Sequence, residues 1–302
     1  MKNRTKRPYL LYLIAIPIVA AATIILRTIA LLGDYEADIG RYTDGTVSLI
    51  NAILLLAIVG ILALFTHELR ELFVFRPNYR DLPTLFSGAF CAIALIFFGI
   101  TLTLDILGGE NRYATVLAVF SGIMAILGAV LFILHAFDGA ARGGRFALLN
   151  LPIAVLGVAY PLYLSMRNGQ RIGDPAVLMA TAAWILIAFF FLGESRIALD
   201  RAAWALHTYI TVLTVILSAT LAFPNLIYHL ANGEAILGNS EHDFAALAVF
   251  LYALARLLSI FRTVTHEATG TTRFAMGITQ ADATDTKPQP MRTQKNEKAS
   301  DR

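Results

Sequence analysis

The chain has few charged residues and a single cysteine. Asp, Glu, Lys and Arg make up 15% of its 302 residues, whereas soluble domains carry about 25%. Because 57% of the residues are hydrophobic, a water-soluble fold of this length has too little interior to bury them. The lone Cys91 excludes an intrachain disulfide and does not indicate the redox compartment. These scarcities argue against a soluble domain and favour a lipid bilayer as the solvent.

The motifs of common enzymes are also missing. The segment HELRE at 67–71 ends in Glu71, where the zinc-protease motif H-E-x-x-H needs a second histidine. The chain contains neither the serine-hydrolase motif G-x-S-x-G nor a Walker loop. We therefore expect no catalytic residue, no cofactor and no metal site. A membrane-embedded enzyme is the least supported class of function.

The chain does have eight long apolar stretches. They lie near 9–32, 46–65, 83–104, 114–136, 147–166, 176–192, 203–228 and 244–262. A helix needs roughly 20 apolar residues to cross the hydrocarbon core, and lipid offers no partner for a free backbone amide. The sequence therefore predicts an all-α polytopic membrane bundle over 1–262. The polar segment 263–302 cannot offset its ordering entropy and is predicted to be a disordered cytoplasmic tail.

Basic residues gather at alternate ends of these stretches. Of the 24 Lys and Arg residues, 19 fall on the side of the N-terminus and four on the opposite side. The opposite side collects acidic residues instead: Asp34, Glu36, Asp38, Asp44, Asp105, Glu110, Asp174, Glu234, Glu241 and Asp243. Because loops rich in Lys and Arg stay in the cytoplasm, both termini are predicted to be cytoplasmic.

Two arginines lie inside apolar stretches. Arg27 is near the outer end of the first stretch, and Arg256 is near the inner end of the last. A charge in lipid is costly, so it suggests a function by default. Each side chain is also close enough to a span end to reach the interface by snorkelling. For Arg27 a third interpretation is a pair with Asp34 or Glu36 in the following loop.

The loop at 33–45 is the densest polar feature. Its acids alternate as D-x-E-x-D at Asp34, Glu36 and Asp38. An EF-hand loop needs Gly at its sixth position and Glu at its twelfth, whereas this loop has Ile39 and Gly45 there. Another kind of weak divalent-cation site stays an alternative. The other interpretation is an acidic outer loop with Tyr35 and Tyr42 at the level of the lipid head groups.

The seventh stretch carries a polar stripe. It consists of His207, Thr211, Thr214, Ser218 and Asn225, whose spacing keeps them on one helix face. The stripe could line a polar pathway or a groove for lipid head groups. Alternatively, its hydroxyls bond to the preceding turn and to neighbouring helices, which is ordinary helix packing.

The fifth stretch contains Pro152, Tyr160 and Pro161. Two prolines in one span predict a broken helix, and such helices often line a cavity. If this protein moves a solute or a lipid, we expect Tyr160, Thr214 and Ser218 to face one interior cavity. A closed bundle would favour an accessory or scaffold role.

Two segments carry a resemblance to other proteins. Arg27 precedes LLGDYEADIGRYTDG at 31–45, and the last stretch contains ALARLL at 253–258. In these features the chain resembles an uncharacterised family of multi-pass inner-membrane proteins from Firmicutes-type bacteria. That family has an arginine in the first span, followed by an acidic loop with glycine and aromatic residues. The resemblance covers a small part of the chain. It implies a bacterial inner-membrane location and transfers no activity.

The central turns of the eight stretches lack Asp, Glu, His, Lys and Arg. Ion-coupled carriers place such groups near the midplane of the membrane. The sequence thus favours a permease-like or lipid-handling protein without ion coupling. The alternative is an accessory or scaffold protein that binds a partner through its outer loop or its tail. Expected partners are the bilayer, a lipid or small neutral ligand, and another membrane protein; nucleic acid is not expected.

Overall fold

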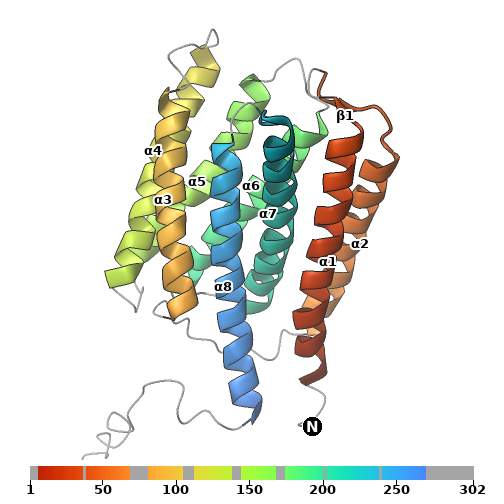
Figure 1. Cartoon of the computed structure of the whole chain (residues 1–302). Helices are drawn as coiled ribbons and strands as arrows, with labels where there is room; N and C mark the ends of the chain where they lie inside the picture. Colours follow the sequence, from red (N-terminus) through yellow and green to blue (C-terminus); the bar gives the residue numbers. More distant parts are fainter. Residues whose placement is uncertain are drawn as a thin grey trace, which may run out of the picture.

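The prediction of eight apolar helices is confirmed. The computed structural model describes residues 6–36, 39–68, 81–104, 112–137, 144–167, 174–199, 201, 203–237 and 240–269. Its helices are α1 (Lys6–Gly33), α2 (Thr46–Glu68), α3 (Leu82–Leu104), α4 (Arg112–Phe137), α5 (Gly144–Arg167), α6 (Pro175–Ala198), α7 (Trp204–Asn232) and α8 (Glu241–Thr269). In the described parts of the chain, all eight are long and apolar enough to cross a membrane (Figure 1). This architecture indicates a multi-pass membrane protein.

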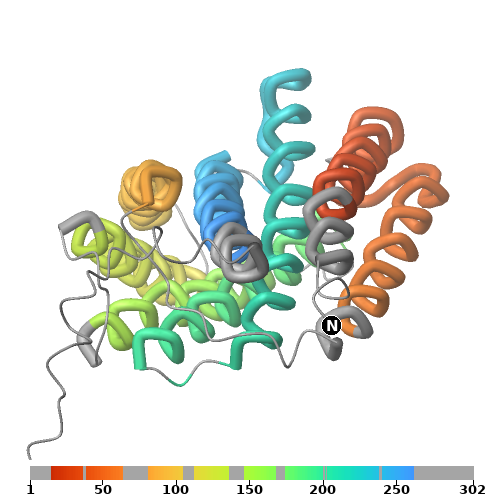
Figure 2. Tube along the Cα trace, turned by 90° about the horizontal axis from the view of Figure 1, so that it is seen from below, coloured from red at the N-terminus to blue at the C-terminus, as the bar shows by residue number. Residues whose placement is uncertain are grey.

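Six of the helices close into a ring. From α3 to α8 each helix packs against the next, and α8 returns to pack against α3. Helix α1 packs on the outside of α7, and α2 packs on α1 and α7, so these two helices form an appendage to the ring (Figure 2). The start of α1 and the end of α8 lie at the same end of the bundle (Figure 1). We call this the terminal end, and we call the opposite end the hairpin end.

Aromatic side chains fill the inside of the ring. Phe98 of α3 stacks on Trp184 of α6, with ring centroids 5.7 Å apart. Tyr252 of α8 stacks on Phe191 of α6 and meets Phe132 of α4 edge to face. These five side chains are almost completely buried. Large rings carry the greatest contact area of any side chain, so the centre of the bundle is packed along this layer.

The hairpin end takes its name from two short strands. β1 (Tyr35–Glu36) pairs antiparallel with β2 (Arg41–Tyr42). Gly40 has a φ of 64°, a left-handed conformation that glycine adopts without steric cost. The sequence analysis did not predict these strands, because they are too short for an alternating pattern. Tyr35 is buried between the rings of Tyr42 and Tyr228, so the hairpin folds onto the bundle.

The prediction of a broken fifth helix is wrong. Helix α5 runs without interruption through Pro152 and Pro161. Neighbouring helices, side chains and small local adjustments can satisfy the backbone groups that proline frees in a membrane helix. The largest extensions past a predicted end are in α6, which continues beyond 192 to Ala198, and in α8, which continues beyond 262 to Thr269. The rest of the predicted tail, 270–302, lies outside the described residues.

Glycine sets the closest approach between α5 and α6. A Cβ atom added at Gly157 would lie 2.5 Å from the carbonyl oxygen of Trp184 and 2.9 Å from the backbone nitrogen of Ala188. Because both obstacles are backbone atoms, they cannot move aside as a side chain could. We therefore expect Gly157→Ala to separate the two helices locally and to lower the stability by about 1–3 kcal/mol.

Thermal unfolding in mild detergent measures this effect. Gly60→Ala in α2 is the matched control, because nothing lies within 4 Å of the added methyl group. The control should be neutral or slightly stabilising, since alanine favours a helix more than glycine does. Equal unfolding temperatures for the two variants would contradict the close packing of α5 on α6.

Candidate functional site

The predicted polar stripe of α7 is buried, and none of its residues lines the pocket described below. Thr211 donates a hydrogen bond to the carbonyl oxygen of His207 over 2.7 Å. Thr214 donates to the carbonyls of Ile210 and, on α6, Leu186. The Ser218 hydroxyl is fully buried with no partner among the described residues. The hydrogen bonds of Thr211 and Thr214 support the interpretation of the stripe as ordinary helix packing. Its two end residues, His207 and Asn225, belong to two separate polar clusters.

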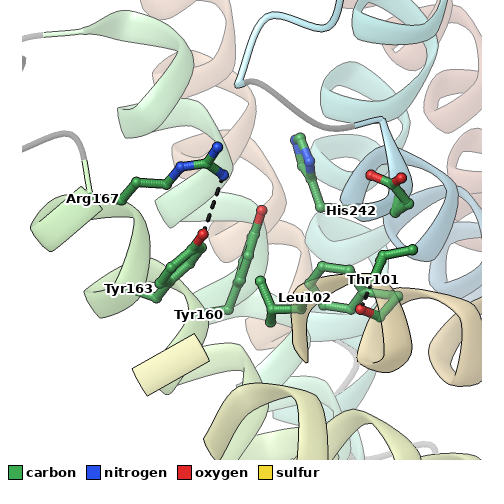
Figure 3. Close-up of a pocket in the computed structure, with 8 residues that line it drawn as sticks. Thr101, Leu102, Tyr160, Tyr163, Arg167 and His242 are labelled. Carbon is green, nitrogen blue, oxygen red and sulfur yellow. Dashed lines mark hydrogen bonds between the residues drawn. The ribbon is translucent and has the colours of Figure 1, made fainter. Parts of the chain in front are cut away.

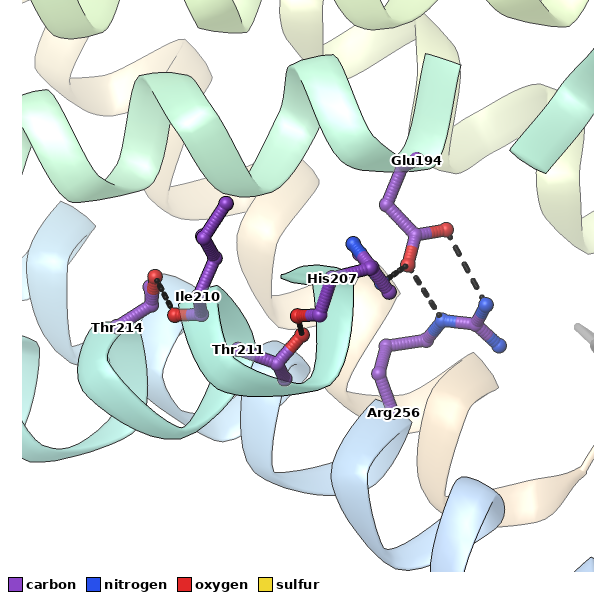
Figure 4. Close-up of polar contacts among 6 residues, drawn as sticks. All are labelled: Glu194, His207, Ile210, Thr211, Thr214 and Arg256. Carbon is purple, nitrogen blue, oxygen red and sulfur yellow. Dashed lines mark hydrogen bonds and ion pairs between the residues drawn. The ribbon is translucent and has the colours of Figure 1, made fainter. Parts of the chain in front are cut away.

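The cluster at the terminal end is centred on Glu194 of α6 (Figure 4). Arg256 of α8 donates from Nε to Glu194 Oε1 and from Nη2 to Oε2, each over 3.2 Å. His207 of α7 places Nε2 3.1 Å from the same Oε1. An ionised carboxylate only accepts hydrogen bonds, so this histidine nitrogen carries the proton. The three side chains are at most 3% exposed, and together they tie α6, α7 and α8.

Small and aromatic residues hold His207 in place. Its ring stacks on Phe190, with centroids 5.6 Å apart. A Cβ at Gly193 would overlap its Nδ1 atom, so only glycine leaves room for the ring there. Arg256 therefore does not snorkel; it forms an internal ion pair. The sequence analysis missed Glu194 because the apolar stretch ends at Leu192, although the helix continues past it.

Arg27 also turns inward, but toward a residue that the sequence analysis did not consider. Its Nη2 donates to Asn225 Oδ1 of α7 over 2.9 Å, and Asn225 Nδ2 donates to Asp243 Oδ1 of α8 over 2.8 Å. His242 places Nε2 3.0 Å from that same Asp243 oxygen. We call these four residues the polar chain. It crosses from α1 through α7 to α8, and all four side chains are at most 4% exposed.

The acidic loop residues do not form the predicted pair with Arg27. Glu36 accepts a hydrogen bond from the hydroxyl of Thr43, and Asp34 contributes its backbone carbonyl to the amide of Thr43. Asp38 lies outside the described residues. Among the residues that are described, no three His, Cys, Asp and Glu side chains converge as a metal site.

Two groups in this loop have shifted pKa values. Hydrogen bonds from the hydroxyl and amide of Thr46 lower the pKa of the exposed Asp44 carboxyl. Burial raises the pKa of Tyr42, although the positive charge of Arg27 acts in the opposite direction. Tyr35, the other tyrosine expected near the head groups, points inward and donates to the carboxylate of Asp174. That carboxylate also caps the start of α6 by accepting from the amide of Ala176.

A pocket lies inside the ring at the hairpin end (Figure 3). Its lining residues come from α3, α5 and α8: Phe98, Thr101, Leu102, Tyr160, Tyr163, Arg167, Glu241 and His242. The pocket with its open mouth encloses ≈ 220 Å³, and its enclosed part has room for about one water molecule. Below it the rings of Phe98 and Tyr160 pack on Trp184. His242 belongs both to the pocket and to the polar chain.

Two polar groups in this pocket form neither a hydrogen bond nor an ion pair with the described residues. The Tyr160 side chain is 3% exposed, and its hydroxyl points into the pocket without forming a hydrogen bond. Glu241 Oε2 is buried and accepts no hydrogen bond. By contrast, Arg167 at the mouth donates from Nη1 to the Tyr163 hydroxyl over 3.2 Å. Unsatisfied polar atoms in a concave site are available to a ligand, which makes this pocket the candidate functional site.

The sequence analysis selected only Tyr160 from this pocket. Glu241 was counted only among the acidic residues of the outer side, and Arg167 and His242 were not singled out. Thr214 and Ser218, which were expected to share a cavity with Tyr160, do not line this pocket. The signal that could have found the site is weak: three polar residues lie within one turn of a span end on α5 and α8.

Comparison of the chain with protein-family models, with curated proteins and with solved structures gives no match. The resemblance to an uncharacterised bacterial family therefore stays a prediction.

The ion pair between Glu194 and Arg256 predicts strong coupling. Glu194→Leu or Arg256→Met alone leaves one buried charge without its partner, so each should cost about 3–5 kcal/mol of stability. The double variant removes both charges and should cost clearly less than the sum of the two single changes. Thermal unfolding of the four proteins in one detergent measures this cycle.

Arg196→Met is the control for this cycle. Arg196 lies on the same helix but is exposed, so its loss should change the stability by no more than about 0.5 kcal/mol. Strict additivity of the two single changes would show that Glu194 and Arg256 do not interact.

Proposed function

We propose that this chain is a permease-like or lipid-handling protein that binds a small ligand in the hairpin-end pocket. The observation that carries the proposal is that the Tyr160 hydroxyl and the buried Glu241 Oε2 atom belong to residues lining one pocket and form no hydrogen bond with the described residues. A buried carboxylate oxygen without a partner costs free energy, and a bound donor group removes that cost. The site therefore has a physical reason to hold a ligand.

The size of the pocket limits what can bind. Sites for drug-sized molecules usually enclose about 300–1,000 Å³, whereas the enclosed part of this pocket measures ≈ 10 Å³, the space of about one water molecule. A whole solute does not fit this space, so the proposal is that one polar group of a small solute or of a lipid head group enters the pocket while the rest of the ligand lies at its open mouth. The packed aromatic layer beneath supports binding at one end rather than an open path through the ring.

Ion coupling is not part of the proposal. Coupled carriers use carboxylates that gain and lose a cation during transport. Glu194 is held by Arg256 and His207, and Asp243 accepts from Asn225. Both carboxylates thus already have protein partners, which supports a structural role for them.

We place the protein in a bacterial cytoplasmic membrane with both termini in the cytoplasm. The support is the excess of Lys and Arg at one end, 19 against four. In this orientation the pocket opens on the outer side, where a head group of the outer leaflet or a solute could enter it.

Cysteine labelling tests this orientation. In a Cys91→Ala background, Ala37→Cys should react with a membrane-impermeant maleimide in intact cells, and Ala140→Cys should react only after the cells are opened. The Cys91→Ala parent is the control and should not react. Labelling of position 140 in intact cells would show that the orientation is the opposite of the one proposed.

Native mass spectrometry of the gently solubilised full chain tests ligand binding. We expect a lipid or a small molecule to remain bound to the protein, and Tyr160→Phe to reduce its occupancy because the hydroxyl supplies one hydrogen bond. Tyr113→Phe is the control, because that side chain is 76% exposed and lies outside the pocket. Equal ligand occupancy in both variants would show that the pocket is not the binding site.

A second candidate function is that of an accessory or scaffold protein. The observation that favours it is the burial of Thr214 and Ser218 in helix contacts, because the transport role called for them in a cavity with Tyr160. If the solubilised protein retains another membrane protein and no small ligand, that result supports the accessory or scaffold role.

A further inference from the structure

We infer that the group which enters the hairpin-end pocket is a hydroxyl, so that the ligand is a polyol or a lipid with a hydroxyl-bearing head group. This inference rests on the proposed function, because it names the class of ligand for the same pocket. The enclosed part of the pocket has room for about one water molecule. A hydroxyl is close to water in size, and it can both donate and accept a hydrogen bond.

The first polar group that such a ligand meets is the Tyr160 hydroxyl. The side chain is 3% exposed, and its hydroxyl points into the pocket (Figure 3) without a hydrogen bond to the described residues. Edge-to-face contacts hold the ring, with Phe98 at 5.0 Å and Trp184 at 5.1 Å between centroids. Buried tyrosine hydroxyls usually have a partner. Because this ring is packed in place, the partner has to come to the hydroxyl.

The second polar group is the Oε2 atom of Glu241. This residue belongs to the first turn of α8 and lines the same pocket. Its Oε2 atom is buried and accepts no hydrogen bond from the described residues. The charge of the Glu241 carboxylate is close enough to act on the Tyr160 hydroxyl. An ionised carboxylate only accepts hydrogen bonds, so this oxygen needs a donor.

A single hydroxyl serves both groups, whereas a charged group serves one. The hydroxyl donates to Glu241 Oε2 and accepts from Tyr160. An ammonium group has donors only, so it would leave the Tyr160 proton without an acceptor, and it would share the pocket with the positive charge of Arg167. An anionic group has acceptors only, so it would leave Glu241 Oε2 without a donor and would lie beside a second negative charge.

A hydroxyl-bearing ligand has two sources. One is a free polyol that enters from the aqueous phase, and the other is the head group of phosphatidylglycerol. Both carry hydroxyls at the end of a short chain, so one hydroxyl can enter the enclosed space while the rest of the molecule stays at the mouth. The chemistry that the pocket recognises is the same, so the experiment includes a probe for each.

Trp184 provides the signal for binding, because its ring packs on Tyr160 and on Phe98, both of which line the pocket. The chain has two tryptophans, so Trp204→Phe leaves Trp184 as the single fluorophore. The full chain with this change is placed in nanodiscs of phosphatidylcholine, whose head group has neither a hydroxyl nor an N–H group. Fluorescence is followed during each titration.

The probes form two matched sets. Among soluble probes, glycerol carries hydroxyls, methylammonium a positive charge and acetate a negative charge. Among lipids, phosphatidylglycerol carries head-group hydroxyls, whereas phosphatidylethanolamine has an ammonium group in their place. In at least one set we expect the hydroxyl-bearing probe to bind at least about tenfold more tightly than its charged counterparts, because a hydrogen bond to a charged group contributes that much. The set that shows this preference identifies the source of the ligand.

Substitutions then assign the two hydrogen bonds. Tyr160→Phe should weaken the hydroxyl-bearing probe about threefold to tenfold, since it removes one neutral hydrogen bond. Glu241→Gln should weaken it by at least as much, because the bond to a carboxylate is the stronger of the two. Tyr113→Phe and Glu234→Gln are the controls, because both side chains are exposed and lie outside the pocket; both should bind like the parent.

Thermal unfolding without a probe separates binding from folding. Tyr160→Phe should unfold at the same temperature as the parent or slightly above it, because the hydroxyl that it removes has no hydrogen bond in the protein. Tyr160→Phe therefore remains a usable test if Glu241→Gln proves too unstable to purify. A large loss of stability in Tyr160→Phe would show that the hydroxyl serves the fold and would contradict the inference.

The remaining outcomes are distinct. If a charged probe binds as tightly as its hydroxyl-bearing counterpart, or native mass spectrometry finds a bound molecule that has no hydroxyl, the hydroxyl inference is wrong while ligand binding stands. A bound molecule with a hydroxyl, whose occupancy falls in Tyr160→Phe, supports the inference. If no probe changes Trp184 fluorescence and no molecule remains bound, the proposed function fails, and the inference fails with it.

Discussion

Polar groups inside this bundle must find their partners in the protein, because lipid supplies none. The most demanding case is the carboxylate of Glu194, which is 1% exposed. It receives hydrogen bonds from Arg256 of α8 and His207 of α7, so three helices of the ring meet at one charge. At the hairpin end Arg27 is bound in the same manner through Asn225 and Asp243. These contacts fix how α1, α6, α7 and α8 lie against one another.

The need of buried polar groups for partners is also the reason why the pocket is a candidate site. Its walls contain a Tyr160 hydroxyl that forms no hydrogen bond to the described residues and the buried Oε2 atom of Glu241, which forms none either. Other buried polar atoms without hydrogen bonds exist, such as Nε of Arg27 and the hydroxyl of Ser218, but neither residue lines this pocket. Glu241 differs because its unsatisfied Oε2 atom belongs to a carboxylate that lines the pocket. The polar chain reaches this pocket at His242 and links it to α1.

The eight helices could be predicted from the sequence because the length and the hydropathy of a membrane span are local properties. The partners of the charges could not be predicted, because they depend on which helices become neighbours. Arg27 is bound by Asn225, 198 positions away, whereas sequence reasoning looked only at the adjacent loop. Glu194 was assigned to a loop because the apolar stretch ends before it. The prolines of α5 were expected to break a helix that its neighbours keep intact.

The central claim is that the hairpin-end pocket receives a polar group of a bound ligand at the Tyr160 hydroxyl. The most direct measurement is a cryo-electron microscopy map of the full chain in nanodiscs containing phosphatidylglycerol, with an antibody fragment to aid alignment. The account predicts density at the mouth of the pocket that continues to the Tyr160 hydroxyl. A pocket that contains no additional density, or only a single ordered water, would contradict it.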